Sequence, residues 1–377
     1  MNALGWADIV EGRRRGAAAG CLRLALAPPS LAYRLAVAAR NAAFDRGLLR
    51  ARRLPRPVIS VGNLAVGGAG KTPFAMLLAR GLRARGLRAA VLSRGYGASA
   101  EGPFFPRLVS NGAGAILSPR EAGDEAHLLA RGLPGTVVAI DPDRLRAGEM
   151  AARRFPVDVF ILDDGFQHRR LRRDLDILLL DGTNPFGNGR LLPAGRLREP
   201  PSAARRADAI VFTRCPGPPP PHALRRLREL GAGARIFTAT HQPARLARPG
   251  PGPVEDPASL RKTPVAAFCG LAEPEGFFRT LEGLGARVVL SRRFPDHHPY
   301  RPAEIETLAR AAAAAGAAVL VTTAKDAVRI PETPTLPLPL RVLEIEMKIG
   351  GGEAQMLEWV FESLGTAARR GKGPAPE

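Results

Sequence analysis

Apolar residues along the chain fall into two recurring patterns, short continuous runs and longer stretches at helical spacing. The continuous runs predict strands at residues 58–61, 89–93, 137–141, 157–162, 177–180 and 209–213. The helical spacing predicts helices at residues 73–85, 122–131 and 144–154. Strands rich in Val, Ile and Leu that alternate with helices are typical of a parallel sheet covered on both faces. The pattern therefore predicts an α/β fold built on a doubly wound, mostly parallel sheet.

A second α/β set follows two proline-rich stretches, residues 216–221 and 243–257, which we interpret as loops and linkers. This set comprises predicted strands at 265–269, 288–290, 319–322 and 341–345 and predicted helices at 275–284 and 302–315. We therefore predict a core of residues 55–240 and a smaller α/β domain of residues 241–364. The basic stretch 365–377 lacks apolar periodicity, and we expect it to be disordered.

The first 54 residues are predicted to form a separate, basic segment. Residues 1–56 hold eleven arginines and three carboxylates, a net charge of +8. Short apolar runs between the arginines predict amphipathic helices before and after the proline pair 28–29, of the kind that lies on anionic membrane surfaces. The longest uncharged stretch is far shorter than the ~20 apolar residues that a membrane span needs. Simple packing of these helices on the core is the alternative.

The composition is that of a globular protein with an unusual positive charge. The 377 residues are 45% hydrophobic and 24% charged, which excludes global disorder, a collagen-like fibre and a multi-span membrane protein. The formal net charge is +20, but only five of the 55 basic residues are lysine, so much of this charge fits a compositional bias toward arginine. Cys21, Cys215 and Cys269 form no CxxC pair, which argues against a zinc ribbon or a disulfide framework. No nucleic-acid reader motif is present, so we expect no nucleic-acid partner.

A phosphate-binding loop follows the first predicted strand. Residues 62–73 read Gly-Asn-Leu-Ala-Val-Gly-Gly-Ala-Gly-Lys-Thr-Pro, with Ala65 where the general pattern has glycine. Glycines let the backbone N–H groups surround phosphate oxygens, and the following helix presents its N-terminus to the anion. Lys71 is expected to contact the β- and γ-phosphates, and Thr72 to bind Mg²⁺. The predicted nucleotide-binding residues are Gly67, Gly68, Ala69, Gly70, Lys71, Thr72 and Pro73.

Two carboxylates end the strand predicted at 157–162. Asp163 and Asp164 stand where a P-loop enzyme places its metal-coordinating acid, so we predict that they bind Mg²⁺ together with Thr72. An Asp-Gly turn at the end of a strand is the alternative. The pair Lys325-Asp326 lacks the spacing of a guanine-specificity motif, so nothing in the sequence selects GTP.

Together these segments resemble the tetraacyldisaccharide 4′-kinase (lipid A 4′-kinase) family of the P-loop NTPase superfamily. The resemblance runs in family order from about residue 55 to 330. Besides the phosphate loop, it rests on Ser-Arg-Gly-Tyr-Gly at 93–97, Gly-Asp-Glu at 123–125, Leu-Asp-Asp-Gly-Phe-Gln-His-Arg at 162–169, Leu-Pro-Ala-Gly-Arg-Leu-Arg-Glu-Pro at 192–200, Phe-Pro-Asp-His-His-Pro-Tyr at 294–300 and Thr-Thr-Ala-Lys-Asp-Ala-Val-Arg at 322–329.

The resemblance implies an ATP- and Mg²⁺-dependent transfer of the γ-phosphoryl group to the 4′-hydroxyl of an acylated glucosamine disaccharide 1-phosphate. The product would be the bis-phosphorylated lipid A precursor. It also implies a peripheral protein on the cytoplasmic face of a Gram-negative inner membrane, and no obligate protein partner is evident. Two other functions stay open: a P-loop kinase or ligase acting on a soluble small molecule, and a nucleotide-gated basic membrane adaptor.

The resemblance also implies roles for individual residues. Asp124 matches the family's catalytic acid/base, and His297 matches the partner that orients it and shares its proton. Lys71 completes the predicted catalytic set. An N-cap is the alternative for Asp124, and a packed or surface histidine is the alternative for His297. The residues expected to line the substrate site or its rim are Glu125, Gln167, His168, Arg198 and Glu199.

Overall fold

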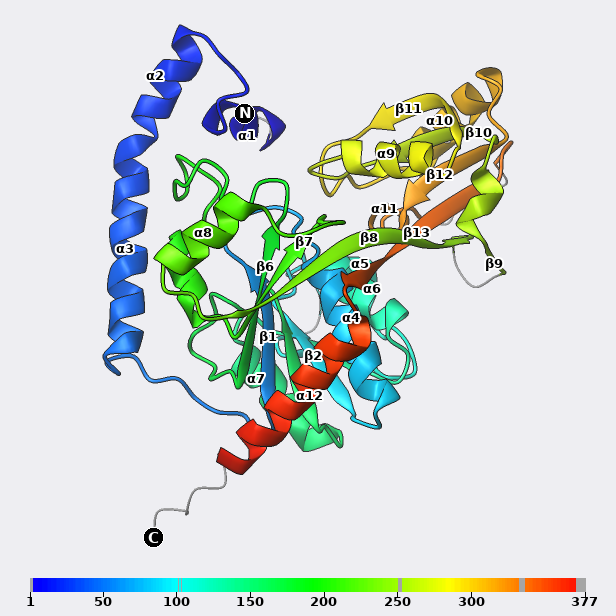
Figure 1. Ribbon diagram of the computed structural model, residues 1–377. Coiled ribbons are helices and arrows are strands. Elements are labelled where there is room, and N and C mark those ends of the chain that lie inside the picture. The colour runs from blue at the N-terminus through cyan, green and yellow to red at the C-terminus, as the bar shows by residue number, and fades with distance from the viewer. Residues whose placement is uncertain (1–2, 101, 103, 250–252, 332–335, 371–377) are drawn as a thin grey trace.

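The computed structural model describes residues 3–100, 102, 104–249, 253–331 and 336–370. Within these residues, the fold is built on a single sheet of 13 strands (Figure 1). From one edge to the other the strands are β11 (Arg287–Arg293), β10 (Pro264–Cys269), β12 (Val319–Thr323), β13 (Leu340–Gly350), β8 (Arg235–Ala247), β7 (Ala209–Thr213), β6 (Leu175–Asp181), β1 (Val58–Asn63), β5 (Val159–Asp163), β2 (Ala89–Ser93), β4 (Val137–Ile140) and β3 (Arg107–Asn111), and β9 (Val254–Glu255) pairs with β8. Most neighbours are parallel, which confirms the predicted fold class.

Two long strands join the two parallel parts of the sheet. β8 continues the parallel order beyond β7, and it pairs antiparallel with β13, which is in turn parallel to β12. In Figure 1, β8 and β13 run together from the core into the smaller lobe. The domain boundary predicted between residues 240 and 241 falls inside β8, and the division of the chain into domains stays a prediction.

The proline-rich stretch 243–257 is not the loop that we predicted. β8 extends through Pro243 to Ala247, β9 follows, and a 3₁₀ helix occupies Pro257–Leu260. Pro243 lies opposite Ile345 at a register shift in the ladder, where a missing N–H does least harm. β8 escaped prediction because only two of its thirteen residues are buried, so it lacks a continuous apolar run.

Helices cover both faces of the sheet. Their bounds are α1 (Ala3–Val10), α2 (Ala17–Ala25), α3 (Ala27–Asp45), α4 (Lys71–Ala84), α5 (Pro119–Ala122), α6 (Asp124–Gly132), α7 (Arg144–Arg154), α8 (Pro221–Glu229), α9 (Glu275–Gly283), α10 (Pro302–Ala314), α11 (Ala324–Ala327) and α12 (Glu353–Arg370), with a further 3₁₀ helix at Pro201–Arg206. Around β1, side chains of α4, α6 and α12 share one core cluster, whereas those of α7 belong to another. Ile59 faces the first cluster and Val58 the second, as the alternation of a strand requires.

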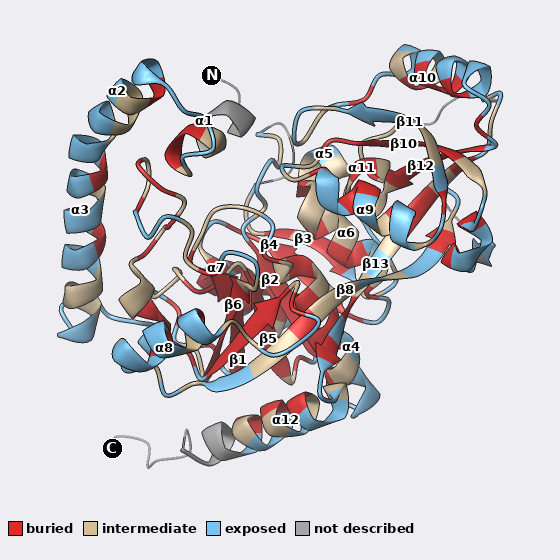
Figure 2. Cartoon of the chain, turned by 45° about the horizontal axis from the view of Figure 1, so that its top comes forward, coloured by how far each residue is buried: buried red, intermediate tan, exposed pale blue. Residues whose placement is uncertain are grey.

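The N-terminal helices lie beside the core rather than within it (Figure 1). α2 and α3 confirm the helices predicted on the two sides of prolines 28–29, although these prolines stand inside the first turn of α3, where their missing N–H groups cost little. Ser30 and Tyr33 of α3 donate hydrogen bonds to the main chain of residues 191 and 198. Figure 2 shows that much of α3 is nevertheless exposed. In the described part of the chain, no helix has the length and apolar character to cross a bilayer.

Helix α12 was missed by the sequence analysis. It includes residues 365–370 of the stretch expected to be disordered, whereas residues 371–377 lie outside the described residues. Its buried Met356, Val360 and Leu364 recur at helical spacing and join the core cluster of α4. α12 is therefore part of the packed core.

We predict that Met356→Ala lowers the free energy of unfolding by about 2–5 kcal/mol, because the Met356 side chain is fully buried and its removal leaves a cavity. Gln355→Ala is the matched control: Gln355 is an exposed neighbour in α12, and its loss should change stability by less than about 0.5 kcal/mol. Urea unfolding measures both. Equal midpoints for the two variants would contradict the packing of α12 on the core.

Candidate active site

β1 and α4 shape the phosphate loop between them. β1 is buried along its whole length, and α4 begins at Lys71, directly after Gly70. Gly70 has a φ of 80°, and a β-carbon there would meet His241 of β8 and Met347 of β13. Glycine is therefore required both for the left-handed backbone and for the close approach of these two strands. The N-terminus of α4 faces the loop, as an anion site needs.

Asp163 lies at the end of β5, in register with Val61 of the neighbouring β1. Thr72 Oγ1 donates a hydrogen bond of 3.1 Å to Asp163 Oδ2, and both side chains are buried. Asp163 Oδ1 is also buried and has no hydrogen-bond partner among the described residues, so it is available to a cation. Burial, reinforced by the charges of Glu125 and Asp164, raises the pKa of Asp163 to about 7. A bound cation would favour the charged form instead.

A second glycine allows the two strand ends to approach each other. A β-carbon on Gly62 would lie 2.6 Å from Phe166 Cβ and 2.7 Å from Phe166 N. Phe166 is fully buried and follows the turn that carries Asp163 and Asp164. The absence of a side chain at Gly62 therefore lets this turn lie against the start of the phosphate loop.

Asp164 has a different environment from its neighbour. Arg198 Nη1 donates to its two carboxylate oxygens at 2.9 and 2.7 Å, and Lys71 Nζ lies 3.7 Å from Oδ1. Burial alone would raise the pKa of Asp164, but the charges of Lys71 and Arg198 outweigh burial and lower it. The two adjacent carboxylates thus have different partners. Asp163 accepts a hydrogen bond from Thr72, and Asp164 pairs with Lys71 and Arg198.

The oxygen donors beside the phosphate loop fit a magnesium ion that is bound together with a nucleotide. In the described part of the chain, no group of three or more His, Cys, Asp or Glu side chains is arranged to hold a metal ion. Thr72 Oγ1 and the unpartnered Asp163 Oδ1 are oxygen donors of the type that Mg²⁺ prefers. A cation bound there would take further oxygens from phosphate groups and water.

Asp124 and His297 are in contact although 173 residues separate them in sequence. Asp124 is the first residue of α6, and His297 lies in the loop after β11. His297 Nδ1 lies 2.9 Å from Asp124 Oδ2, and Arg329 Nε lies 3.2 Å from the same oxygen. The charge of Glu125, the next residue along α6, acts on Asp163, so this end of α6 lies near the Thr72–Asp163 pair.

Three of the residues predicted at the rim have contacts inside the site. Arg198 pairs with Asp164, as described above. Glu125 Oε1 lies 3.7 Å from Lys325 Nζ, and Gln167 Nε2 donates 2.9 Å to the main-chain oxygen of Asn63, at the start of the phosphate loop. These contacts join Gln167, which follows the acidic strand end, to the phosphate loop, and they join the start of α6 to α11 of the smaller lobe.

The other two rim residues are His168, which is partly buried, and Glu199, which is buried. His168 Nε2 lies 3.6 Å from Asp143 Oδ1, and burial, with the charge of Arg144, lowers the pKa of His168 to about 4, so its ring is neutral at neutral pH. Glu199 is 1% exposed and binds Arg206 at 2.8 Å and Asn41 of α3 at 3.0 Å, so it ties α3 to the core. That Glu199 also lines the substrate site or its rim stays a prediction.

The sequence analysis missed a network of ion pairs beside the phosphate loop. Arg196 and Arg214 each donate to a main-chain oxygen of the loop, and both pair with Glu273, which follows β10. Arg196 also pairs with Glu11, just after α1. Arg196 and Arg329 lie in stretches that carried the family resemblance, but Arg214 and Glu273 do not, and their partners are far away in sequence.

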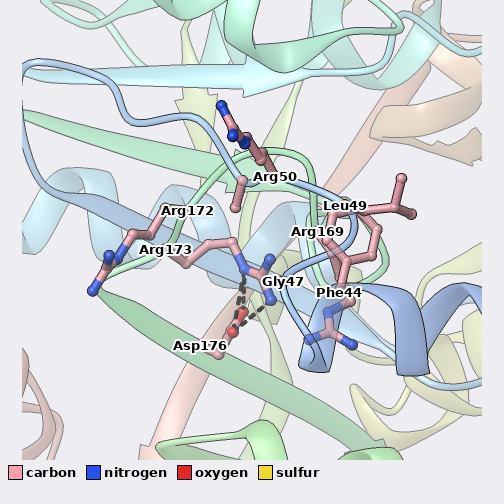
Figure 3. Close-up of a pocket in the computed structure, with 9 residues that line it drawn as sticks. Phe44, Gly47, Leu49, Arg50, Arg169, Arg172, Arg173 and Asp176 are labelled. Atoms are coloured by element: carbon pink, nitrogen blue, oxygen red, sulfur yellow. Dashed lines mark hydrogen bonds and ion pairs between the residues drawn. The ribbon is translucent and has the colours of Figure 1, made fainter.

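An arginine-lined cavity of about 510 Å³ near the end of α3 lies outside the site (Figure 3). Arg173 is paired with Asp176 at 2.9 Å, whereas Arg50 and Arg172 point in different directions. Because these side chains do not converge on one point, the cavity offers no built anion site. None of the candidate site residues lines it.

Comparisons with known proteins find similarity to one family of kinases. A family model described as tetraacyldisaccharide-1-P 4′-kinase matches residues 22–364. A tetraacyldisaccharide 4′-kinase of Anaeromyxobacter dehalogenans strain 2CP-C is 48% identical over 353 residues, which cover 91% of this chain and 90% of the relative. One of Geobacter sulfurreducens is 47% identical over 343 residues, covering 91% and 94%. The crystal structure of LpxK from Aquifex aeolicus in complex with ATP has a TM-score of 0.72 and 34% identity, and the match covers 91% of this chain and 99% of that chain.

We predict that Gly62→Ala destabilises the protein by about 1–3 kcal/mol and weakens ATP binding at least tenfold, because the new methyl group would push the main chain of Phe166 away from β1. Gly276→Ala is the matched control, since a β-carbon at this position of α9 meets no atom within 4 Å. Urea unfolding and calorimetric titration with ATP measure the two effects. Wild-type stability and ATP affinity in Gly62→Ala would show that the close approach is not needed.

Proposed function

Because the chain belongs to the tetraacyldisaccharide-1-P 4′-kinase family, we propose that the geometry described above carries out this family's reaction. The protein is a phosphotransferase with an alcohol acceptor. It transfers the γ-phosphoryl group of ATP to the 4′-hydroxyl of tetraacyldisaccharide 1-phosphate. Family membership removes the support for a soluble-substrate kinase or ligase and for an adaptor without turnover.

The phosphate loop binds the donor in this proposal. Residues 67–72 supply main-chain N–H groups, Pro73 lies in the first turn of α4, and Lys71 supplies a positive charge that Asn63 and Asp164 hold in place. Thr72 and Asp163 would hold Mg²⁺, with Asp164 close by. Such an ion, when bound, would supply positive charge that offsets the negative charge of the phosphate groups. These side chains position the phosphoryl group and stabilise its charge, which is most of what phosphoryl transfer needs from a protein.

Asp124 is the base that we propose for the acceptor hydroxyl. The 4′-oxygen forms a bond to the γ-phosphorus while the bond from that phosphorus to the bridging oxygen of ADP breaks, and the hydroxyl proton passes to Asp124. An ionised carboxylate only accepts hydrogen bonds, so His297 Nδ1 carries the proton in the contact with Asp124 Oδ2. The histidine therefore orients the carboxylate and shares the proton that it gains. The contact between these two residues is the observation that carries the proposed mechanism.

The exposed side of α2 and α3 supports a further proposal, that the protein rests on an anionic membrane surface. Leu24, Leu31 and Leu35 are 76%, 56% and 62% exposed. Arg23 and Arg34 line the same groove, of about 830 Å³, as two of these leucines. Exposed leucines beside arginines suit the boundary between acyl chains and phosphate headgroups. We infer a peripheral position on the cytoplasmic face of the inner membrane, where the acylated acceptor would be collected.

The kinase reaction is tested with purified protein, ATP, Mg²⁺ and tetraacyldisaccharide 1-phosphate in detergent, with transfer of labelled γ-phosphate as the readout. We predict that Asp124→Asn lowers kcat by about 10²–10⁴-fold, the usual contribution of a general base, and leaves ATP affinity within about twofold of wild type. Glu229→Gln, at an exposed carboxylate of α8, is the control and should retain full activity. Failure of the wild type to phosphorylate the acceptor while it binds ATP would overturn the function. Normal turnover by Asp124→Asn would overturn the proposed base alone.

Membrane association is tested by sedimentation with vesicles of phosphatidylglycerol and phosphatidylethanolamine. We predict that the combined change Leu24→Ser, Leu31→Ser and Leu35→Ser weakens binding at least tenfold, because it removes the apolar groups that would enter the bilayer. The matched control is Phe104→Ser, Val254→Ser and Ile345→Ser, which removes three exposed apolar side chains elsewhere. Equal binding by both triple variants would mean that the α2–α3 surface is not the membrane contact.

A further inference from the structure

Arg329 contacts the proposed base, yet none of the roles assigned above includes it. It lies just after α11, in the stretch 322–329, and its side chain is only 7% exposed. Arg329 Nε lies 3.2 Å from Asp124 Oδ2, the oxygen that also contacts His297. An arginine buried to this extent must be paired, because a buried charge without a partner is costly. Its partners therefore determine where the guanidinium lies.

Residues of the smaller lobe anchor the guanidinium of Arg329. Nη2 donates to Asp326 Oδ1 at 3.2 Å. The same Asp326 oxygen accepts hydrogen bonds of 2.8 Å from the Tyr300 hydroxyl and from the main-chain N–H of Gly270. Asp326 is fully buried, so this anchor is rigid. A planar guanidinium fork with one end anchored in this way presents its other nitrogens in a fixed direction.

The same guanidinium also reaches the segment that carries the histidine partner. Arg329 Nη1 donates 3.2 Å to the main-chain oxygen of His298, the residue after His297. One side chain thus touches the carboxylate of Asp124 and the loop that delivers His297 to it. The contacts of Asp124 with His297 and Arg329 are both made to Oδ2, and among the described residues Oδ1 has no hydrogen-bond partner.

We propose that Arg329 is a positioning residue for phosphoryl transfer. It holds the Asp124 carboxylate in one rotational state, with Oδ2 toward His297 and Arg329, and leaves Oδ1 for the acceptor hydroxyl. It also fixes the loop of His297 relative to α6. Without Arg329 the carboxylate can rotate, and the hydroxyl then meets a correctly oriented oxygen less often. This inference rests on the proposed role of Asp124.

The test is a double-mutant cycle between Arg329→Gln and Asp124→Asn, with kcat and the KM for ATP measured for each variant. We expect Arg329→Gln to lower kcat about 10–100-fold in the wild-type background, with the KM for ATP within twofold of wild type. In the Asp124→Asn background the same change should lower kcat less than threefold, because the group that Arg329 positions is already lost. Arg329→Lys keeps the charge but not the fork, and should fall between Arg329→Gln and wild type.

Arg341→Gln is the matched control for loss of a half-buried ion pair in the same lobe, since Arg341 pairs with Glu255 and its side chain is 13% exposed. It should lower stability without changing kcat. Equal fold losses from Arg329→Gln in both backgrounds would overturn the proposal, because they indicate a general structural effect. Normal kcat in Arg329→Gln, or in Arg329→Lys if the glutamine variant does not fold, would also overturn it. An inactive wild type, or a fully active Asp124→Asn, would instead contradict the proposed function or its base.

Discussion

The antiparallel pairing of β8 with β13 is the constraint on which the site depends. It joins the two parallel parts of the sheet over residues 342–350 of β13, and such a ladder resists slipping because a shift by one residue would turn each side chain to the opposite face. This fixed joint brings His297 from the smaller lobe to Asp124 of the core. It also places His241 and Met347, which are opposite each other in the ladder, against Gly70 of the phosphate loop. The loop and the proposed base are therefore positioned by the same pair of strands.

Burial explains which parts of this arrangement could be predicted from the sequence. Three strands, β1, β2 and β7, are buried on both faces. Each is therefore a continuous apolar run in the sequence, and its ends were predicted within two residues. β8 has only two buried residues and contains Pro243, so the strand that joins the lobes carries no such run. α12 does have apolar residues at helical spacing, but the basic residues that follow were interpreted as the start of a disordered tail.

The candidate site divides in the same way between local and distant contacts. Lys71, Thr72 and Asp163 could be predicted because the chemistry of a phosphate loop requires those residue types next to a strand and a helix. Asp124 and His297 were found only through the resemblance of their motifs. The adjacent Asp163 and Asp164 looked equivalent in sequence, yet burial raises the pKa of one and neighbouring cations lower that of the other. Such differences arise from side chains that the fold brings from elsewhere, and no local pattern encodes them.

Several of the chain's many arginines have a structural role at the site. Arg196, Arg214 and Arg329 each bind at least two acceptors at once, which a guanidinium fork can do and an ammonium group does less well. They tie loops from both lobes to the phosphate loop and to the proposed base. Lys71, one of only five lysines in the chain, instead places a compact positive charge at the phosphate loop, where Asn63 and Asp164 hold it. The arginines thus connect the loops around the site, while the charge at the start of α4 is that of a lysine.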